Sequence, residues 1–225
     1  MRRWFTLIAL LTLIAGVAAA GDIATFENLG FSESGDVFVF GQYGVTGDQA
    51  GPFAEIYFVD VAGNRFLPNG TFDRASTAPL SLGQDGRGAL YGLMREADAL
   101  FESREVDHLA TGRPVYILVD GDEPRERLTF RDFNAQNRYD VRLIQETRGS
   151  GDDVSAAFRI ELTLTRADDR VQSITIGRPS LYRDGVASYR ISQILVGPDD
   201  AAVVFVVEKR SPDGTVRYMV ETAAL

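Results

Sequence analysis

The 225-residue sequence contains no cysteine, which removes two common ways of holding an exported protein together or in place. Disulfide bonds are excluded, and so is the lipid-modified cysteine that anchors bacterial lipoproteins. The fold must therefore be held by its hydrophobic core. The composition can supply one, because 45% of the residues are hydrophobic and 10% are aromatic, as in folded domains and unlike disordered chains.

Histidine is almost absent as well, and His108 is the only one in the chain. A zinc site would need carboxylates placed beside it, and a Ser-His-Asp triad would need the same histidine. No Gly-x-Ser-x-Gly elbow presents a serine, no calcium loop has EF-hand spacing, and no glycine-rich phosphate loop precedes a helix. We therefore predict no catalytic residues, no metal site and no cofactor.

A hydrophobic run long enough to span a bilayer, about 20 residues, is also missing. The first apolar run begins at Trp4, after two arginines, and ends near Val17, before three alanines. This is the layout of a signal peptide. We expect residues 1–20 to be cleaved, leaving no stable membrane span, and residues 21–225 to form a single mainly-β domain that is exported to the periplasm.

Positive charge is scarce, since 23 basic residues face 32 acidic ones and give a net charge of −9. Removal of Arg2 and Arg3 with the first 20 residues leaves 21 basic residues and a net charge of −11. A chain this acidic repels nucleic acid unless its basic residues are segregated, and here they are interspersed with acids. Nucleic acid is therefore excluded as a partner, and an envelope protein or a glycan remains.

The chain contains two copies of one unit, an apolar residue followed by a polar turn and a short apolar strand. The first copy runs from Gly30 to Gly44 and the second from Val196 to Glu208, so that Phe40 aligns with Phe205. The following strands match as well, in the pairs Tyr57 with Tyr218, Val59 with Val220 and Asp60 with Glu221. We expect the two units to lie in one sheet or in facing sheets, with Phe40 and Phe205 in the same core.

The repeat is compatible with a sandwich or with a propeller-like array. Propellers usually need four or more blades of about 40 residues, and the sequence between the two copies contains no convincing further copy. Alternating apolar residues predict a hairpin over 139–143 and 158–164, followed by a third strand at 171–176. The predicted fold class is mainly β, with antiparallel sheets arranged as a sandwich or a partial propeller-like stack.

One amphipathic helix is predicted between the two copies. Its apolar residues recur at helical spacing on a single stripe: Leu90, Leu93, Met94, Ala97, Leu100 and Phe101. We expect the helix to cover one face of a sheet and to belong to an insertion near residues 68–112.

Two kinds of side chain offer a functional site. Aromatic residues cluster in the repeated strands, and Gln42 and Tyr43 at a strand end are the predicted ligand-binding residues, although core packing is the alternative for such aromatics. Pairs of carboxylates would serve a glycan hydrolase. The candidates all fall in predicted turns, where aspartate also caps backbone N–H groups: Asp120, Asp122, Asp152, Asp153, Asp199 and Asp200.

Both ends of the mature chain carry a family resemblance, in particular the strings FGQYG (40–44) and RYMVET (217–222). They resemble an uncharacterised family of predicted secreted bacterial proteins known mainly from spirochaetes, which implies export and assigns no catalytic residue. The repeated unit is also similar to that of TolB-type propellers, where Pro-Asp-Gly turns recur at each blade. Our interpretation is an exported binding or structural module of the envelope, with a carboxylate-based glycan hydrolase as the alternative.

Overall fold

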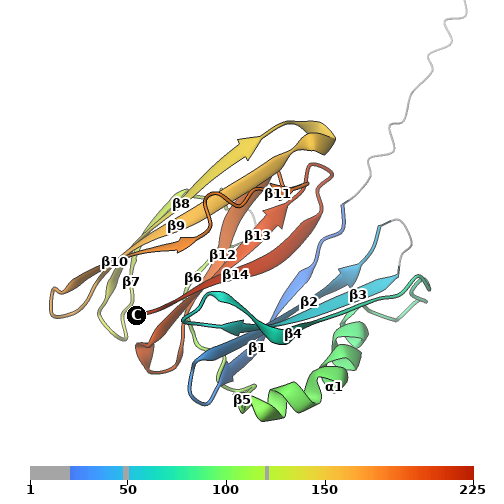
Figure 1. The fold of residues 1–225 in the computed structure, drawn as a ribbon, viewed down its shortest axis with the longest axis horizontal. Coiled ribbons are helices and arrows are strands. Elements are labelled where there is room, and N and C mark those ends of the chain that lie inside the picture. The colour runs from blue at the N-terminus through green and yellow to red at the C-terminus, as the bar shows by residue number, and fades with distance from the viewer. Residues whose placement is uncertain (1–20, 48–50, 120–121) are drawn as a thin grey trace, which may run out of the picture.

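The computed structural model describes residues 21–47, 51–119 and 122–225, which form three antiparallel sheets and one helix (Figure 1). The signal peptide expected over residues 1–20 lies outside the described residues. The N-terminal sheet has the order β4-β3-β2-β1-β5. Its strands are β1 (Thr25–Ser32), β2 (Val37–Val45), β3 (Pro52–Asp60), β4 (Arg65–Ala75) and β5 (Val106–Asp107).

The other two sheets are built from the remainder of the chain. The central sheet has the order β14-β13-β12-β6, with β6 (Arg113–Ile117), β12 (Ser188–Val196), β13 (Ala202–Arg210) and β14 (Val216–Ala224). The outer sheet has the order β10-β9-β8-β7, with β7 (Arg127–Arg131), β8 (Arg138–Arg148), β9 (Ser155–Thr165) and β10 (Val171–Gly177). A short strand, β11 (Arg183–Asp184), pairs with β9. The predicted hairpin and its third strand are thus confirmed as β8, β9 and β10.

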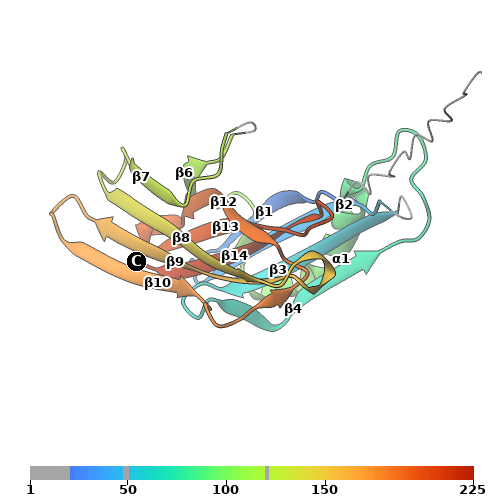
Figure 2. The ribbon, with the colours of Figure 1, turned by 90° about the horizontal axis from the view of Figure 1, so that it is seen from above.

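The sheets stack face to face, with the helix α1 (Arg87–Ser103) on one side (Figures 1 and 2). The predicted stripe is confirmed, since the helix buries Leu90, Leu93, Ala97 and Phe101 against the N-terminal sheet. The other face of that sheet packs on the central sheet through a second cluster that includes Phe40 and Val204. The order of layers is therefore helix, N-terminal sheet, central sheet and outer sheet, without propeller closure among the described residues.

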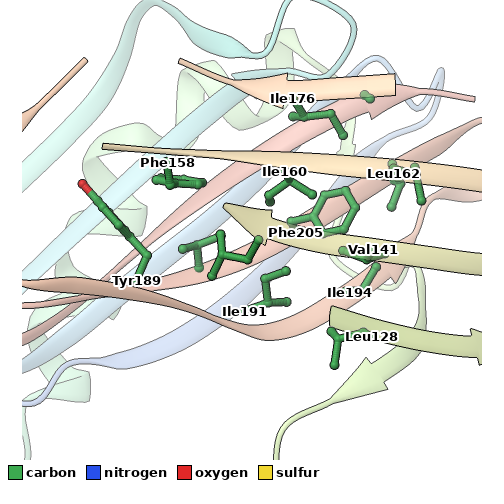
Figure 3. Close-up of a cluster of buried hydrophobic side chains, with 14 of the residues drawn as sticks. Leu128, Val141, Phe158, Ile160, Leu162, Ile176, Tyr189, Ile191, Ile194 and Phe205 are labelled. Atoms are coloured by element: carbon green, nitrogen blue, oxygen red, sulfur yellow. The ribbon is translucent and has the colours of Figure 1, made fainter. Parts of the chain in front are cut away.

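Strand β13 explains why the central sheet lies in the middle of this stack. Its first seven residues are all buried. Val204 and Val206 face the N-terminal sheet, whereas Val203, Phe205 and Val207 face the outer sheet. In Figure 3, Phe205 lies among side chains of the outer sheet that include Val141, Ile160 and Leu162. A continuous apolar strand needs cover on both faces, and the stack provides it.

The internal repeat corresponds to two equivalent meanders, β1-β2-β3 and β12-β13-β14. Each carries a register shift in its first strand pair, between Asn28 and Gly30 in one and between Ile191 and Gln193 in the other. The aligned turns also match, because Gly35 has φ 74° and the aligned Asp200 has φ 54°, both in the left-handed region.

The expectation of facing sheets is confirmed, but the prediction that the two aligned phenylalanines share one core is wrong. Phe40 packs between the N-terminal and central sheets, whereas Phe205 packs between the central and outer sheets. The two meanders are stacked in the same orientation, so corresponding side chains point the same way and each reaches the next layer. A single sandwich would have brought both residues into one core.

The segment predicted as a helical insertion includes residues of two strands as well as the helix. The range predicted for the helical insertion, 68–112, includes most of β4 and all of β5, and both strands pair within the N-terminal sheet. The part added to the sheet is therefore centred on α1. Across the described residues, no helix is long and apolar enough to cross a membrane.

Deletion of residues 216–225 tests how far the stack depends on its last strand. This change removes β14, whose Val216 and Val220 are 3% and 6% exposed, and uncovers the strand β13 beside it. We expect the shortened protein to lose its cooperative thermal transition in circular dichroism, because the exposed apolar area has no other cover. A shortened protein with an unchanged melting temperature would contradict this role of β14.

Candidate binding cleft

A cleft of about 350 Å³ opens where the stacked sheets meet along one side. The edge strands on that side are β4, β14 and β10, one from each sheet. The chain turns away from β10 at Gly177, whose φ of 95° favours glycine, and residues 178–183 then run beside the cleft. The N-terminal sheet, the central sheet and residues 178–183 all contribute to the lining. The lining residues are Phe40, Tyr57, Val59, Asn64, Arg65, Phe66, Arg178, Leu181, Arg183, Lys209, Tyr218, Met219, Val220 and Glu221.

An aromatic row from the N-terminal sheet contributes three of its four side chains, Phe40, Tyr57 and Phe66, to one wall of the cleft. Phe26, Phe40, Tyr57 and Phe66 lie on successive strands, with ring centroids 5.6, 5.0 and 4.9 Å apart. Phe40 is fully buried, whereas Phe66 at the end of the row is 48% exposed. The row therefore continues the core outward and presents an apolar surface at the mouth of the cleft.

Three cations in the lining, Arg178, Arg183 and Lys209, form no ion pair with a described carboxylate. The fourth cation, Arg65, is paired with Asp60 at 3.1 Å. This makes the cleft a region of positive charge on an acidic protein.

Arg183 is fixed by its surroundings instead of by a counter-charge. Its guanidinium carbon lies 5.6 Å from the ring centroid of Phe158 and 5.9 Å from that of Tyr189. Its Nη1 atom is buried and has no hydrogen-bond partner among the described residues. An arginine packed beside a pair of aromatic rings keeps its charge while losing part of its hydration.

Burial shifts the ionisation of the two charged groups on β13 and β14. The pKa of Lys209 is lowered, mainly because burial disfavours the ammonium form and also because Arg183 and Arg217 repel it, while Glu55 acts in the opposite direction. The pKa of Glu221 is raised, mainly by burial, although the amide of Asn64 and the nearby arginines favour its charged form.

The open edge of β14 is closed by side chains at two points. The N–H of Tyr218 donates to Gln42 Oε1 at 2.7 Å, and the N–H of Thr222 donates to Asn64 Oδ1 at 2.8 Å. Val220 lies midway between them on a strand without a bulge, so its N–H and C=O point to the same side. No described group hydrogen-bonds to these two backbone groups of Val220, which lines the cleft.

The predicted ligand-binding residues lie away from the cleft lining. Gln42 is 1% exposed, and its Nε2 donates to Glu55 Oε2 at 2.6 Å and to the Tyr218 carbonyl at 3.3 Å. Tyr43 is 7% exposed and packs against the helix, where its hydroxyl accepts a hydrogen bond from Arg87 Nε at 2.8 Å. Their role in ligand binding stays a prediction, and the structure gives both side chains partners within the protein.

The candidate carboxylates are dispersed. Asp120 lies outside the described residues, and Asp200 hydrogen-bonds to Arg113, which also pairs with Asp132 at 2.6 Å. A second hollow of about 300 Å³ contains Asp122 together with Glu208.

Two of these acids, Asp200 and Glu208, form ion pairs with arginines. Glu208 in the second hollow is bound by Arg190, with one contact of 2.9 Å, and by Arg210. His108 Nδ1 is 2.7 Å from the carbonyl oxygen of Leu29. Within residues 21–47, 51–119 and 122–225, no group of three histidines or carboxylates is arranged to hold a metal ion.

Sequence reasoning did not find the cations of the cleft, because they come from separate sheets and the layer order is not written in any local pattern. One signal was available. Lys209 is the only lysine in the chain, and only Glu208 separates it from the apolar residues of β13. A lone lysine at the end of a buried strand is unusual enough to mark a special environment.

The architecture is that of a mainly β protein built from three stacked antiparallel sheets with one covering helix. Residues 39–224 match the DUF2259 family, which is described as a predicted secreted protein. The chain belongs to this family, whose function is unknown. The resemblance noted in the sequence is thus confirmed at the level of a predicted secreted family. No curated protein matches the chain.

Replacement of Lys209 tests the electrostatic description of the cleft. We expect Lys209→Met to raise the stability at pH 7 by about 1 kcal/mol, or the melting temperature by about 2–4 °C, because a buried and unpaired charge is removed. The lowered pKa of Lys209 means that the unfolded chain binds more protons than the folded one between the two pKa values. The wild type therefore gains stability as the pH rises toward 10.5, and the difference from Lys209→Met shrinks.

Chemical denaturation of the two proteins from pH 7 to pH 10 measures that difference. Lys209→Arg is the matched control, because it keeps the charge and should bring no gain in stability. If Lys209→Met is less stable than the wild type at pH 7, the cation is stabilised by a partner that this description lacks.

Replacement of Gln42 tests whether its amide joins two sheets. Gln42→Leu leaves the N–H and C=O of Tyr218 without this side-chain partner, and we expect a loss of about 2–4 kcal/mol in urea denaturation. Gln172→Leu, on the edge strand β10, is the control and should change stability by less than about 1 kcal/mol. Equal effects of the two substitutions would argue against an inter-sheet role for Gln42.

Proposed function

We propose that this protein is a binding module of the bacterial envelope that takes a small ligand into the cleft between its three sheets. The observation that carries the proposal is the group of three cations, Arg178, Arg183 and Lys209, beside an aromatic wall and without paired carboxylates among the described residues. Ligand sites typically combine an apolar wall with a few convergent polar groups in a volume of about 300–1,000 Å³.

The energetics support a functional reason for these cations. A desolvated charge without a partner lowers stability, and such groups are commonly replaced by apolar ones unless they serve another purpose. The protein has a net charge of −9, so a cluster of unpaired positive charge is not a general feature of its surface. An anionic ligand would supply the missing counter-charge.

We also propose the periplasm as the place where this binding occurs. The signal-like N-terminal sequence and the membership of a predicted secreted family support export. The absence of cysteine leaves no residue for lipid attachment of the lipoprotein type.

The lining of the cleft does not favour the alternative of a glycan hydrolase. Hydrolysis by carboxylates requires two acids about 5–10 Å apart on either side of the bond that is cleaved. The described lining of this cleft includes a single carboxylate, Glu221, which the amide of Asn64 engages through a hydrogen bond.

The test is to expose the purified mature protein to a small-molecule extract of its host envelope, remove unbound material and analyse the retained compounds by mass spectrometry. We expect at least one compound to remain on the wild type and to be lost or reduced about tenfold in Phe66→Ala, which removes the exposed end of the aromatic wall. Phe133→Ala is the matched control, because Phe133 is 78% exposed and lies outside the cleft lining.

Two results would count against the proposal. Retention of no compound by the wild type would remove its basis. Retention that is equal in all three proteins would place any binding elsewhere on the surface.

A further inference from the structure

We infer that the cleft recognises the free C-terminus of a short peptide, with the terminal carboxylate at the cations and the residue before it paired with the edge of β14. This inference deepens the proposed function and rests on it. Three features of the cleft carry it: the open backbone groups of Val220, the side chains that close the edge on either side of them, and the charge of the lining.

The first feature is the pair of unbonded backbone groups at Val220. Its N–H and C=O point to the open side of β14, as do those of Tyr218 and Thr222, whose N–H groups donate to Gln42 and Asn64. A donor and an acceptor at this spacing are what an extended peptide meets when it adds to a sheet edge. In an antiparallel pairing, the C=O of Val220 would accept the N–H of the ligand's second-to-last residue, and the N–H of Val220 would donate to the C=O of that same residue.

The second feature limits how much of a peptide can bind. Gln42 occupies the edge at Tyr218, and Asn64 occupies it at Thr222. A peptide that continued along the edge would have to displace one of these side chains from its hydrogen bonds. The open length thus fits the N–H and C=O of a single ligand residue, which favours the end of a chain over an internal segment.

The third feature selects which end of the chain binds. Arg178, Arg183 and Lys209 outnumber the one carboxylate in the lining, Glu221. Arginine and lysine bind carboxylates through charge-assisted hydrogen bonds, whereas an N-terminal ammonium would be repelled. The cationic lining therefore favours the C-terminus.

The aromatic wall indicates the preferred last side chain. Phe66 and Tyr57 stack at 4.9 Å, and Leu181 and Met219 also line the cleft. These groups offer an apolar surface beside the open edge. We expect a C-terminal residue with a large apolar side chain to bind better than one with a charged side chain.

The experiment compares N-acetyl-Gly-Phe as the free acid with the same compound as its C-terminal amide, by isothermal titration of the mature protein. The two probes differ only in the charged group. We expect the acid to bind at least tenfold more tightly than the amide, the ratio typical of a charge-assisted hydrogen bond.

Variants separate this recognition from effects on folding. Lys209→Met should weaken binding of the acid about fivefold or more while leaving the fold at least as stable. Glu221→Gln removes the one negative charge of the lining and should strengthen binding of the acid. Arg95→Gln, on the exposed side of α1, is the control, and it should change the affinity for neither the acid nor the amide.

Three outcomes would overturn the inference. They are equal affinity for acid and amide, weaker binding of the acid by Glu221→Gln, and stronger binding of digalacturonate, an acidic saccharide, than of the peptide acid. A compound retained from the envelope extract when the peptide acid fails to bind would overturn this inference and leave the proposed function standing. Failure of both assays would overturn both.

Discussion

The structure depends on one constraint, the burial of the central sheet on both faces. Strand β13 is apolar at consecutive positions, so its side chains reach into two different cores. Phe205 and its neighbours alone would be exposed on a two-layer sandwich. The outer sheet covers that face and the N-terminal sheet covers the other. Without cysteine, this packing is the main source of stability available to the chain.

The cleft follows from the same stacking. Three sheets packed face to face leave three edge strands along one side, and an edge strand has backbone groups that need partners. Side chains from other layers supply them on β14, where Gln42 and Asn64 bond to the backbone. A similar contact joins the central and outer sheets, since Gln145 bonds to the backbone of Tyr189 at 2.8 Å. Val220 lies between two such contacts and remains open to the cleft.

The fold was predictable from the sequence where the signal was local. The alternation of apolar residues placed the strands of the outer sheet, helical spacing placed α1, and the repeated unit placed two meanders. The direction in which the meanders stack was not predictable. A repeat in sequence does not say whether Phe40 and Phe205 face one another or point the same way, because that choice depends on a third layer from residues 127–177.

The candidate site was harder to predict than the fold, because its charged residues come from positions far apart in the sequence. Arg183 begins β11 beside the outer sheet, Lys209 lies near the end of β13, and Phe66 lies near the start of the edge strand β4. None of them has a motif. The sequence singles out Gln42 with Tyr43 at the end of an apolar strand, and the hydrogen bonds of Gln42 to Tyr218 give it a partner within the protein.

The most direct test of this account is the hydrogen exchange of single backbone amides on β14, followed by NMR in the ligand-free protein. The account predicts that the amide of Val220 exchanges faster than those of Tyr218 and Thr222, which are held by Gln42 and Asn64. It also predicts that a bound peptide acid slows Val220 selectively. If the amide of Val220 is as protected as its neighbours without a ligand, the edge of β14 is closed and the proposed mode of binding is wrong.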